Sequence, residues 1–376
     1  MTPETEVELS EMITAAKGPL RVVGSGTRPV GHVVTGETLS TTRLSGIVTY
    51  EAGALTIVAR SGTPIEEIEA ALAAEGQRLP FEPMDHRGLL GTEGAPTIGG
   101  IVAANVSGPR RIAVGACRDF LLGVRFVDGI GRSLKNGGRV MKNVTGYDLV
   151  KLMAGSRGTL GVLTEVSFKV LPEPPAQAVL MIDGLSDAEA VAAMTSALGS
   201  PFDVTGAAHS SSGIDGKPVT MTRIEGFADS VTYRIERLQD VLASHGEVRV
   251  ATDKEHCAAL WKWVRDVEGF HNEAGDVWCF SVKPTMAPQM GADLRAKGAL
   301  NLLYDWGGGR IWVLAPQGQN MRPDGMNGHA TLIRASEDTR RKLSVFQPEA
   351  LPLKKISQGL RDKFDPKGIL NPGLMG

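Results

Sequence analysis

The 376-residue chain has few cysteines, no long apolar run and no excess of either charge. Its three cysteines, Cys117, Cys257 and Cys279, are far apart and odd in number, and no C-x-x-C pair occurs. The sequence therefore encodes neither a zinc ribbon nor an iron–sulfur cluster, and we expect no metal site. The three thiols are expected to be free and buried.

Segments that would direct the chain to a membrane or out of the cell are also lacking. No apolar run approaches the roughly 20 residues that span a bilayer. Residues 1–11 are acidic, without the basic start and apolar centre of a signal peptide. We expect a cytoplasmic protein with no transmembrane segment, which leaves open a peripheral position at the inner membrane through a complex.

The charge balance excludes a dedicated nucleic-acid binder. The chain has 40 Lys and Arg against 42 Asp and Glu, a net charge of −2. Neutralising nucleic-acid phosphates needs a basic excess that this chain does not have. A hydrophobic share of 42% and a charged share of 22% are ordinary for a globular protein.

Glycine is abundant, and its distribution divides the chain. There are 46 glycines, well above the average of roughly 7%, and the excess lies largely before residue 165. All five tryptophans follow residue 260. A chain of this length favours two domains, and the shift in composition indicates that they have different roles.

The first glycine loop follows a short apolar strand over residues 20–23. It reads Gly-Ser-Gly-Thr-Arg-Pro over residues 24–29. A Rossmann fingerprint would need a third glycine at the start of a helix, where Pro29 stands, and residues 31–34 do not read as a helix. What remains is a loop with several N–H donors, a hydroxyl and Arg28, which suits an anion.

Two further glycine-rich segments are candidates to line the same ligand. Residues 97–105 read Thr-Ile-Gly-Gly-Ile-Val-Ala-Ala-Asn, and their small side chains fit either a backbone pressed against a flat ligand or a tightly packed helix. Residues 155–164 read Gly-Ser-Arg-Gly-Thr-Leu-Gly-Val-Leu-Thr and run into an alternating strand over 162–170. Turn N–H groups there can form an anion-binding nest, although a plain tight turn has the same composition.

Capping signals predict several helices. Capping boxes begin at Thr63, Ser186 and Thr252. The helix after Thr252 carries Trp261 and Trp263, whose side chains serve either a partner surface or the core.

Alternating apolar residues predict the strands. Hairpins are expected at 123–134 and 300–314, each turning at glycine. The order over residues 178–251 is strand, helix, strand, strand, helix, strand. This is the pattern of a ferredoxin-like α+β unit.

The order of these motifs resembles one flavoprotein superfamily. Gly-x-Gly-Thr after a strand, Thr-Ile-Gly-Gly, a hairpin, Lys-Asn-Val-Thr-Gly-Tyr-Asp at 142–148 and the 155–164 segment follow one another as in the PCMH-type (vanillyl-alcohol oxidase) FAD-binding domain. Residues 363–373 resemble the C-terminal return of that superfamily to the flavin. Residues 260–266 and 328–334 resemble, more narrowly, the smaller flavin subunit of bacterial glycolate oxidase.

The resemblance implies an α+β fold and a site for FAD. It implies a PCMH-type FAD-binding domain of two subdomains over residues 1–174, a ferredoxin-like α+β cap over 175–345, and a C-terminal segment, 346–376, that returns to the first domain. The FAD is expected to be non-covalent, because Thr27 stands where members with a covalent flavin carry histidine; a thioether to Cys117 is the alternative. The expected cofactor-binding residues are Gly24, Ser25, Gly26, Thr27, Arg28, Thr97, Gly99, Gly100, Ala103, Asn105, Gly155, Gly158, Thr159, Gly161, Val162 and Asn371.

The sequence offers fewer candidate residues for catalysis on a hydroxy acid than for binding FAD. Such a reaction needs a base for the hydroxyl proton, cations for the carboxylate and access to the flavin. Related enzymes carry clustered histidines and a Glu-His pair, whereas the Glu255-His256 pair of this chain falls in the first turn of a helix. The candidate catalytic residues are His329, Arg310 and Arg334, with a strand-packed His329 as the alternative.

The expected flavin site is complete, whereas the expected hydroxy-acid site lacks the clustered histidines of related enzymes. Three functions are compatible with this combination. The first is an auxiliary or electron-relaying FAD subunit of a multi-subunit glycolate oxidase, with a larger flavin subunit and an iron–sulfur subunit as partners. The second is a free-standing FAD-dependent dehydrogenase of a small 2-hydroxy acid such as lactate. The third is a non-catalytic scaffold that retains FAD. The sequence favours the first.

Overall fold

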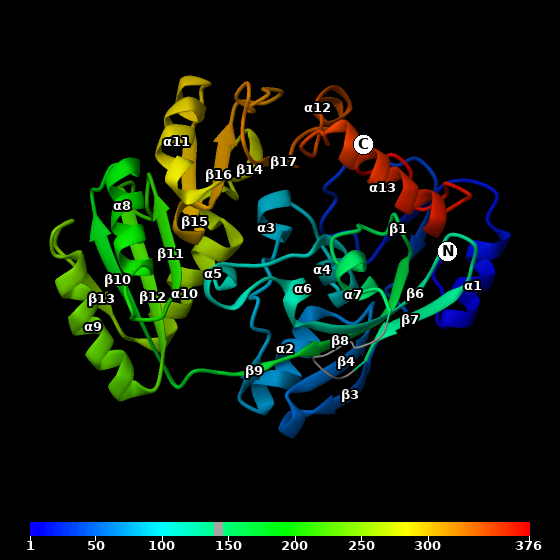
Figure 1. Ribbon diagram of the computed structural model, residues 1–376, viewed down its shortest axis with the longest axis horizontal. Coiled ribbons are helices and arrows are strands. Elements are labelled where there is room, and N and C mark those ends of the chain that lie inside the picture. The colour runs from blue at the N-terminus through cyan, green and yellow to red at the C-terminus, as the bar shows by residue number, and fades with distance from the viewer. Residues whose placement is uncertain (139–145) are drawn as a thin grey trace.

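The computed structural model describes residues 1–138 and 146–376, so residues 142–145 of the 142–148 motif lie outside the described part. Two sheets form its centre, one of five strands and one of eight (Figure 1). Within the described ranges, no helix has the length and apolarity to cross a bilayer. The helices are α1 (Glu6–Ala15), α2 (Ile65–Ala74), α3 (Arg87–Leu90), α4 (Ile98–Ala104), α5 (Arg111–Val114), α6 (Cys117–Phe120), α7 (Leu149–Met153), α8 (Asp187–Leu198), α9 (Ala228–Leu242), α10 (Lys254–Asp266), α11 (Ala287–Ala296), α12 (Glu337–Lys342) and α13 (Leu351–Phe364).

The five-stranded sheet is antiparallel throughout, in the order β3-β4-β8-β6-β7. The predicted hairpin around residue 128 is confirmed as β6 and β7, and the Asp128 carboxylate accepts N–H bonds from Ile130 and Arg132 within its turn. A separate parallel pair, β1 and β2, and a short antiparallel pair, β5 and β9, flank this sheet. The strands are β1 (Leu20–Val23), β2 (Glu37–Ser40), β3 (Ile47–Glu51), β4 (Thr56–Arg60), β5 (Gln77–Arg78), β6 (Leu121–Val127), β7 (Ser133–Gly137), β8 (Val162–Lys169) and β9 (Leu171–Pro172).

The eight-stranded sheet contains the predicted ferredoxin-like unit and extends it. The order β13-β10-β12-β11 is that of a split β-α-β-β-α-β fold, as the sequence pattern predicted. The predicted hairpin β15–β16 continues the sheet from β11, and β14 and β17, which the sequence analysis did not place, complete it. The strands are β10 (Ala176–Asp183), β11 (Val204–Ser210), β12 (Val219–Gly226), β13 (Arg249–Ala251), β14 (Asp276–Ser281), β15 (Asn301–Asp305), β16 (Arg310–Ala315) and β17 (His329–Arg334).

Helices cover both faces of β10, which explains the continuous apolar run over its residues 178–182. Alternate residues of β10, such as Leu180, join the core that includes α8 and α9, whereas Val179 and its neighbours of the same face join α10. A strand that is covered on both faces can be apolar at successive positions. Trp261 of α10 is 2% exposed and lies under the Arg223 guanidinium, so it belongs to the core and not to a partner surface.

Two of the three predicted capping boxes do not form. Ser186 caps α8 in a full box with Glu189, as predicted. The Thr63 hydroxyl instead donates to the Arg60 carbonyl oxygen at 2.7 Å, and Pro64 takes the N-cap position without a side-chain bond. The N-cap of α10 is Asp253 rather than Thr252, since the Asp253 carboxylate accepts the N–H of residue 256 at 2.8 Å. The spacing of a box does not reveal which hydroxyl has a better partner nearby.

The C-terminal segment returns to the first strand, next to the 155–164 loop. Residue Leu20 of β1 bridges to Leu370, and the side-chain oxygen of Asn371 accepts the N–H of Val22 at 2.7 Å. The Asn371 amide nitrogen donates to the carbonyl oxygen of Arg157 at 2.9 Å. Asn371 thus joins β1 to the third glycine loop. Figure 1 shows α13 and the chain end beside the N-terminal segment.

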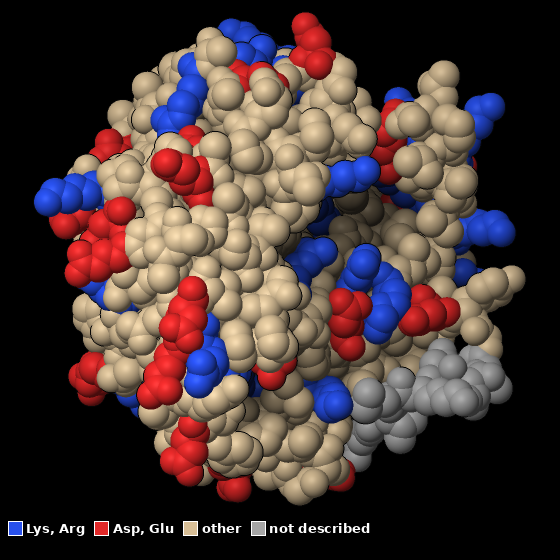
Figure 2. Space-filling view, turned by 60° about the vertical axis from the view of Figure 1, so that its left-hand side comes forward, with Lys and Arg blue, Asp and Glu red and all other residues tan. Residues whose placement is uncertain are grey.

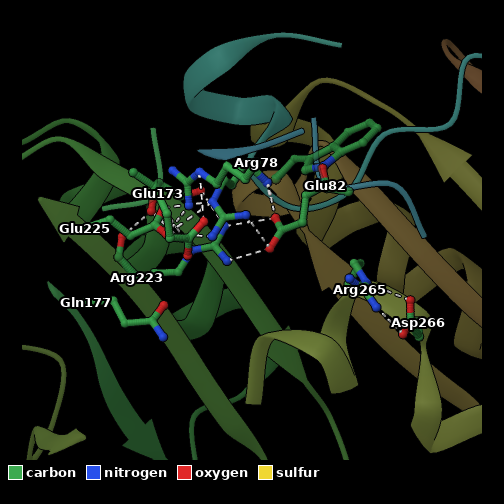
Figure 3. A network of polar contacts seen from close by, with 12 residues as sticks. Arg78, Glu82, Glu173, Gln177, Arg223, Glu225, Arg265 and Asp266 are labelled. Carbon is green, nitrogen blue, oxygen red and sulfur yellow. Dashed lines mark hydrogen bonds and ion pairs between the residues drawn. The ribbon is translucent and has the colours of Figure 1, made fainter. Parts of the chain in front are cut away.

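A buried ionic network joins the early loops to the eight-stranded sheet (Figure 3). Glu82 receives hydrogen bonds from Arg223 of β12, at 2.9 Å and 3.1 Å, and lies 3.0 Å from Arg110. Glu225, also on β12, pairs with Arg110 at 2.6 Å and with Arg78 at 2.9 Å. The five side chains hold β12 against the loop after β5 and the segment before α5.

Candidate cofactor and substrate site

A pocket of about 360 Å³ lies where the three glycine-rich segments meet. The C-terminal segment and α12 close it from another side, through Asn371, Leu374 and Arg340. Twelve of the sixteen expected cofactor-binding residues line it: Gly24, Ser25, Gly26, Arg28, Thr97, Gly99, Gly100, Ala103, Gly158, Gly161, Val162 and Asn371.

The other four expected residues hold the lining segments in place. The Thr27 carbonyl oxygen accepts the Thr92 hydroxyl at 2.8 Å, and Asn105 ends α4 with φ of 49°. The Gly155 N–H donates to Val102 of α4 at 3.0 Å. The Thr159 hydroxyl donates to the Ser156 carbonyl oxygen at 2.7 Å. Direct contact of these four with a cofactor stays a prediction.

Two of the lining glycines are required by protein neighbours, a reason that the sequence does not reveal. A Cβ at position 24 would overlap the hydroxyl oxygen of Thr97. A Cβ at position 99 would lie 2.6 Å from the Cβ of Ser61 and 2.7 Å from its carbonyl oxygen. The absent side chains let the first loop, the start of α4 and residue 61 pack together beneath the pocket.

The pocket is electropositive. Its lining includes Arg21, Arg28, Arg157 and Arg340, and among the described lining residues Glu337 is the only acidic one. Burial lowers the pKa of the Arg157 guanidinium to about 10, which shows that the site does not compensate this charge by itself. On the face that Figure 2 shows, Lys and Arg side chains gather around a hollow. Such a site favours an anionic ligand.

Two serine hydroxyls in the pocket wall have no protein partner within the described ranges. These are the buried Oγ atoms of Ser25 and Ser61. Buried polar atoms are nearly always hydrogen-bonded, so an unpaired pair beside uncompensated arginines indicates a ligand with several acceptors. A dinucleotide with a pyrophosphate and hydroxyl-bearing sugars meets this demand, and the residues present therefore fit FAD.

Two of the three candidate catalytic residues, Arg310 and His329, lie at the same level of the sheet, and Arg334 lies away from them. Arg310 stacks on Trp306 and Trp312, at 4.7 Å and 4.2 Å, and donates to the Ser107 carbonyl oxygen. His329 is exposed on β17, and both it and Arg310 lie opposite the same residue of β14. A strand-packed His329 is thus wrong. Arg334, at the other end of β17, donates to the backbone carbonyls of Leu89, Phe270, His271, Glu273 and Gly275. These bonds hold the loops together, and a catalytic role of Arg334 stays a prediction.

The sequence analysis missed a buried histidine in the pocket wall. His86 is 6% exposed, and its Nε2 accepts the Nε–H of Arg28 at 3.0 Å. Burial, followed by the charges of Arg28 and Arg310, holds the pKa of His86 well below its usual range. His86 stands alone in a proline-rich loop, and no motif or spacing connects it with Arg28.

The thiol of Cys117 is poorly placed for a bond to flavin. It is fully buried, and it does not line the pocket. Burial and the nearby Asp119 carboxylate raise the pKa of the thiol far above its usual range. A thioether needs a reactive thiolate, so the structure favours a non-covalent cofactor.

Solved structures share this fold. 4-Ethylphenol oxidase from Gulosibacter chungangensis matches with a TM-score of 0.72 and 14% identity, over 100% of this chain and 88% of that one. p-Cresol methylhydroxylase matches with a TM-score of 0.70 and 13% identity over the same shares. The α+β fold of the PCMH type, expected from the sequence, is confirmed.

Sequence relatives narrow the class. The FAD binding domain model matches residues 1–136. The glycolate oxidase subunit GlcE of Escherichia coli (strain K12) is 37% identical over 368 residues, 96% of this chain and 93% of that protein. A D-lactate dehydrogenase of Anaerostipes hadrus is 32% identical over 44% of this chain and 34% of its own length. The chain belongs to the PCMH-type family of FAD-binding oxidoreductases, together with the GlcE subunit of glycolate oxidase.

Proposed function

We propose that this chain is the FAD-binding subunit of a multi-subunit glycolate oxidase, with an auxiliary or electron-relaying role in converting glycolate to glyoxylate. The observation that carries the proposal is the electropositive pocket with unpaired serine hydroxyls, built from three separate glycine loops. Likeness to the GlcE subunit along 96% of the chain supports the assignment to glycolate oxidase. We propose a larger flavin subunit and an iron–sulfur subunit as partners, in the cytoplasm or at the inner membrane through the complex.

The pocket residues divide between the two ends of FAD. The N–H groups of the 24–28 loop, with the hydroxyls of Ser25 and Ser61, would hold the pyrophosphate. The wall from Gly158 to Val162 would face the flavin and ribityl parts. When bound, the flavin supplies a two-electron acceptor for oxidation of the alcohol carbon. The chain itself would orient that acceptor.

The proposed domains correspond to the two sheets. Residues 1–174 would form the FAD-binding domain, 175–345 the cap that faces the flavin, and 346–376 the segment that completes the first domain. The crossing between the sheets is short, since β9 ends at residue 172 and β10 begins at residue 176. The bonds of Asn371 to β1 support the assignment of the C-terminal segment.

The purified chain should be yellow and should release its flavin on denaturation. Non-covalent FAD depends on the folded pocket, so trichloroacetic acid should leave a colourless pellet and a yellow supernatant. A yellow pellet would contradict non-covalent binding. A protein that stays colourless after incubation with FAD would contradict the proposed function itself.

The catalytic role is tested by adding glycolate under anaerobic conditions, first to the chain alone and then with its partner subunits. Bleaching only with the partners supports a subunit role. The partial D-lactate dehydrogenase relatives and the position of Arg310 favour, as second candidate, a free-standing hydroxy-acid dehydrogenase. Bleaching of the chain alone by glycolate or lactate would establish this second function instead.

A further inference from the structure

The first two turns of α13 carry apolar side chains that are open to solvent in the described part of the chain. Leu351, Leu353 and Ile356 are 77%, 57% and 62% exposed, and none of the 14 residues of α13 is buried. The helix lies at the edge of the molecule (Figure 1). Exposed apolar side chains that gather in this way mark an interaction site.

The last two turns of the same helix are anchored to the core. Leu360 and Phe364 pack against it, and the ring centroid of Phe364 lies 6.1 Å from that of Phe126. Leu353 and Ile356 precede Leu360 by seven and four residues, spacings that place all three on one side of an α-helix. The apolar stripe therefore continues past the point where the core contact ends. We call its open part, residues 351–357, the α13 step.

The direction of the stripe distinguishes a protein partner from a bilayer. An amphipathic helix binds a bilayer with its whole apolar face flat in the interface. Here the body of the protein lies on the stripe side of the last turns, through Leu360 and Phe364. A flat surface laid against Leu353 would meet that body about two helical turns further on, roughly 10 Å away. A protruding helix or hairpin of a partner chain has no such obstacle.

The rim of the α13 step is basic. The helix carries Lys354, Lys355, Arg361 and Lys363 against Asp362 alone, and none of these four cations forms an ion pair with a described residue. The whole chain has 42 acidic against 40 basic residues, so the basic charge of this helix is local. Two copies of α13 packed face to face would bring like charges together, which disfavours a symmetric dimer. An acidic partner surface would compensate them.

The first turns of α13 have little support of their own. Ala350 stands at the N-cap without a side-chain bond. Within the described residues, the side chains of 351–357 make one hydrogen bond, from Ser357 to Glu349 at 2.9 Å. A helix of this length is marginally stable by itself. A partner that buries the open part of the stripe would stabilise these turns through the apolar surface removed from water.

We propose that the α13 step is the docking surface for another subunit of the oxidase complex, which inserts an apolar ridge flanked by acidic residues. The inference rests on the proposed function, because that function supplies the partner chains. In the sequence, α13 lies between Arg340 and Asn371, both of which line the cofactor pocket. A partner docked on α13 thus contacts the C-terminal segment that closes this pocket.

The test uses the tagged full chain, co-expressed with the larger flavin subunit and the iron–sulfur subunit. Mass photometry of the diluted complex gives the apparent Kd for release of this chain. Leu353→Asp and Ile356→Asp should each raise that Kd by about 30-fold, because a charge replaces an apolar contact at the centre of the interface. Leu300→Asp is the matched control. Leu300 is also 57% exposed, but it precedes β15 in the cap, and its substitution should leave the Kd unchanged.

The basic rim is tested by the double variant Lys354→Glu with Lys355→Glu. It should raise the Kd by about 10-fold at low salt and by less at high salt, since salt screens the attraction that is lost. Each variant should keep the flavin content of the wild type, because none of the substituted residues lines the pocket. A double variant that binds as tightly as the wild type would overturn the acidic character of the partner.

Three further outcomes would contradict the inference. An unchanged Kd in Leu353→Asp and Ile356→Asp overturns the docking surface and leaves the proposed function standing. A chain that forms a dimer by itself, or that binds phosphatidylglycerol vesicles, and loses this property in Ile356→Asp assigns the step to a second copy or to a bilayer instead. A wild-type chain that recruits neither subunit overturns the proposed function, and this inference with it.

Discussion

Replacing Glu82 by leucine should lower the free energy of unfolding by about 3–5 kcal/mol, because it leaves the three arginines of the network with one buried carboxylate, that of Glu225, in place of two. The network holds three arginines and two glutamates, and Glu82 serves both Arg110 and Arg223. The Arg223 side chain is 1% exposed, so water cannot replace the lost carboxylate. Glu82 also has a φ of 50°, which a residue other than glycine rarely adopts. Its ion pairs stabilise that backbone.

Chemical denaturation followed by tryptophan fluorescence measures the effect, with two matched variants. Glu82→Gln keeps the backbone and the shape and should lose less than Glu82→Leu. Glu173→Gln removes a carboxylate that is 41% exposed and 3.8 Å from Arg78, and should cost under about 1 kcal/mol. If Glu82→Leu and Glu173→Gln were equally stable, the network would not hold the sheets together.

The same network should make stability fall in acid. Burial raises the pKa of Glu82, but the charges of Arg223 and Arg110 outweigh burial and hold its pKa below the usual range. Burial also raises the pKa of Glu225, but the charges and hydrogen bonds of the network arginines outweigh burial and hold its pKa well below the usual range. A carboxyl group whose pKa is depressed in the folded state contributes its full stabilisation above the unfolded pKa of about 4.3. This contribution is lost as the pH falls through the pKa of the folded state. Wild type should therefore lose more stability than Glu82→Leu between pH 5 and pH 3.

The sequence predicted the parts of the fold that depend on local pattern. The ferredoxin-like strand order, the Ser186 cap and both hairpins follow from alternation, capping and glycine turns within short windows. The Thr63 box failed because its hydroxyl found the Arg60 carbonyl oxygen, a competition that spacing cannot show. The sheet edge at β17 depends on pairing with β14 across some 50 residues, as its register shows.

In the candidate site too, local sequence patterns do not reveal contacts between residues that are far apart in the chain. The three glycine loops could be predicted to meet because the order of their motifs resembles a flavin domain. The contact of His86 with Arg28 joins residues 58 apart, and the network links Glu82 to Arg223 over 141 residues. No local pattern encodes such pairs. Gly24 and Gly99 line the pocket, but the close neighbours that require glycine at these positions are Thr97 and Ser61.

Gly24→Ala should weaken FAD binding by at least about 100-fold, because its Cβ would displace the Thr97 hydroxyl and part the first loop from α4. The Thr97 hydroxyl accepts the Gly100 N–H and caps α4, so the clash reaches two lining segments at once. Gly18→Ala, where nothing lies within 4 Å of the added Cβ, is the matched control and should keep full affinity.

The steric origin of this loss can be separated from a backbone effect by a second substitution. Thr97→Ala alone removes a cap, at a cost of about 1 kcal/mol. It also removes the oxygen that the new Cβ would meet, and the Thr97 Cβ lies at 3.6 Å, an ordinary contact. Gly24→Ala with Thr97→Ala should therefore bind FAD about as well as Thr97→Ala alone, a strongly non-additive result. Additive losses in unfolding and in FAD titration would mean instead that position 24 needs glycine for its direct approach to the cofactor.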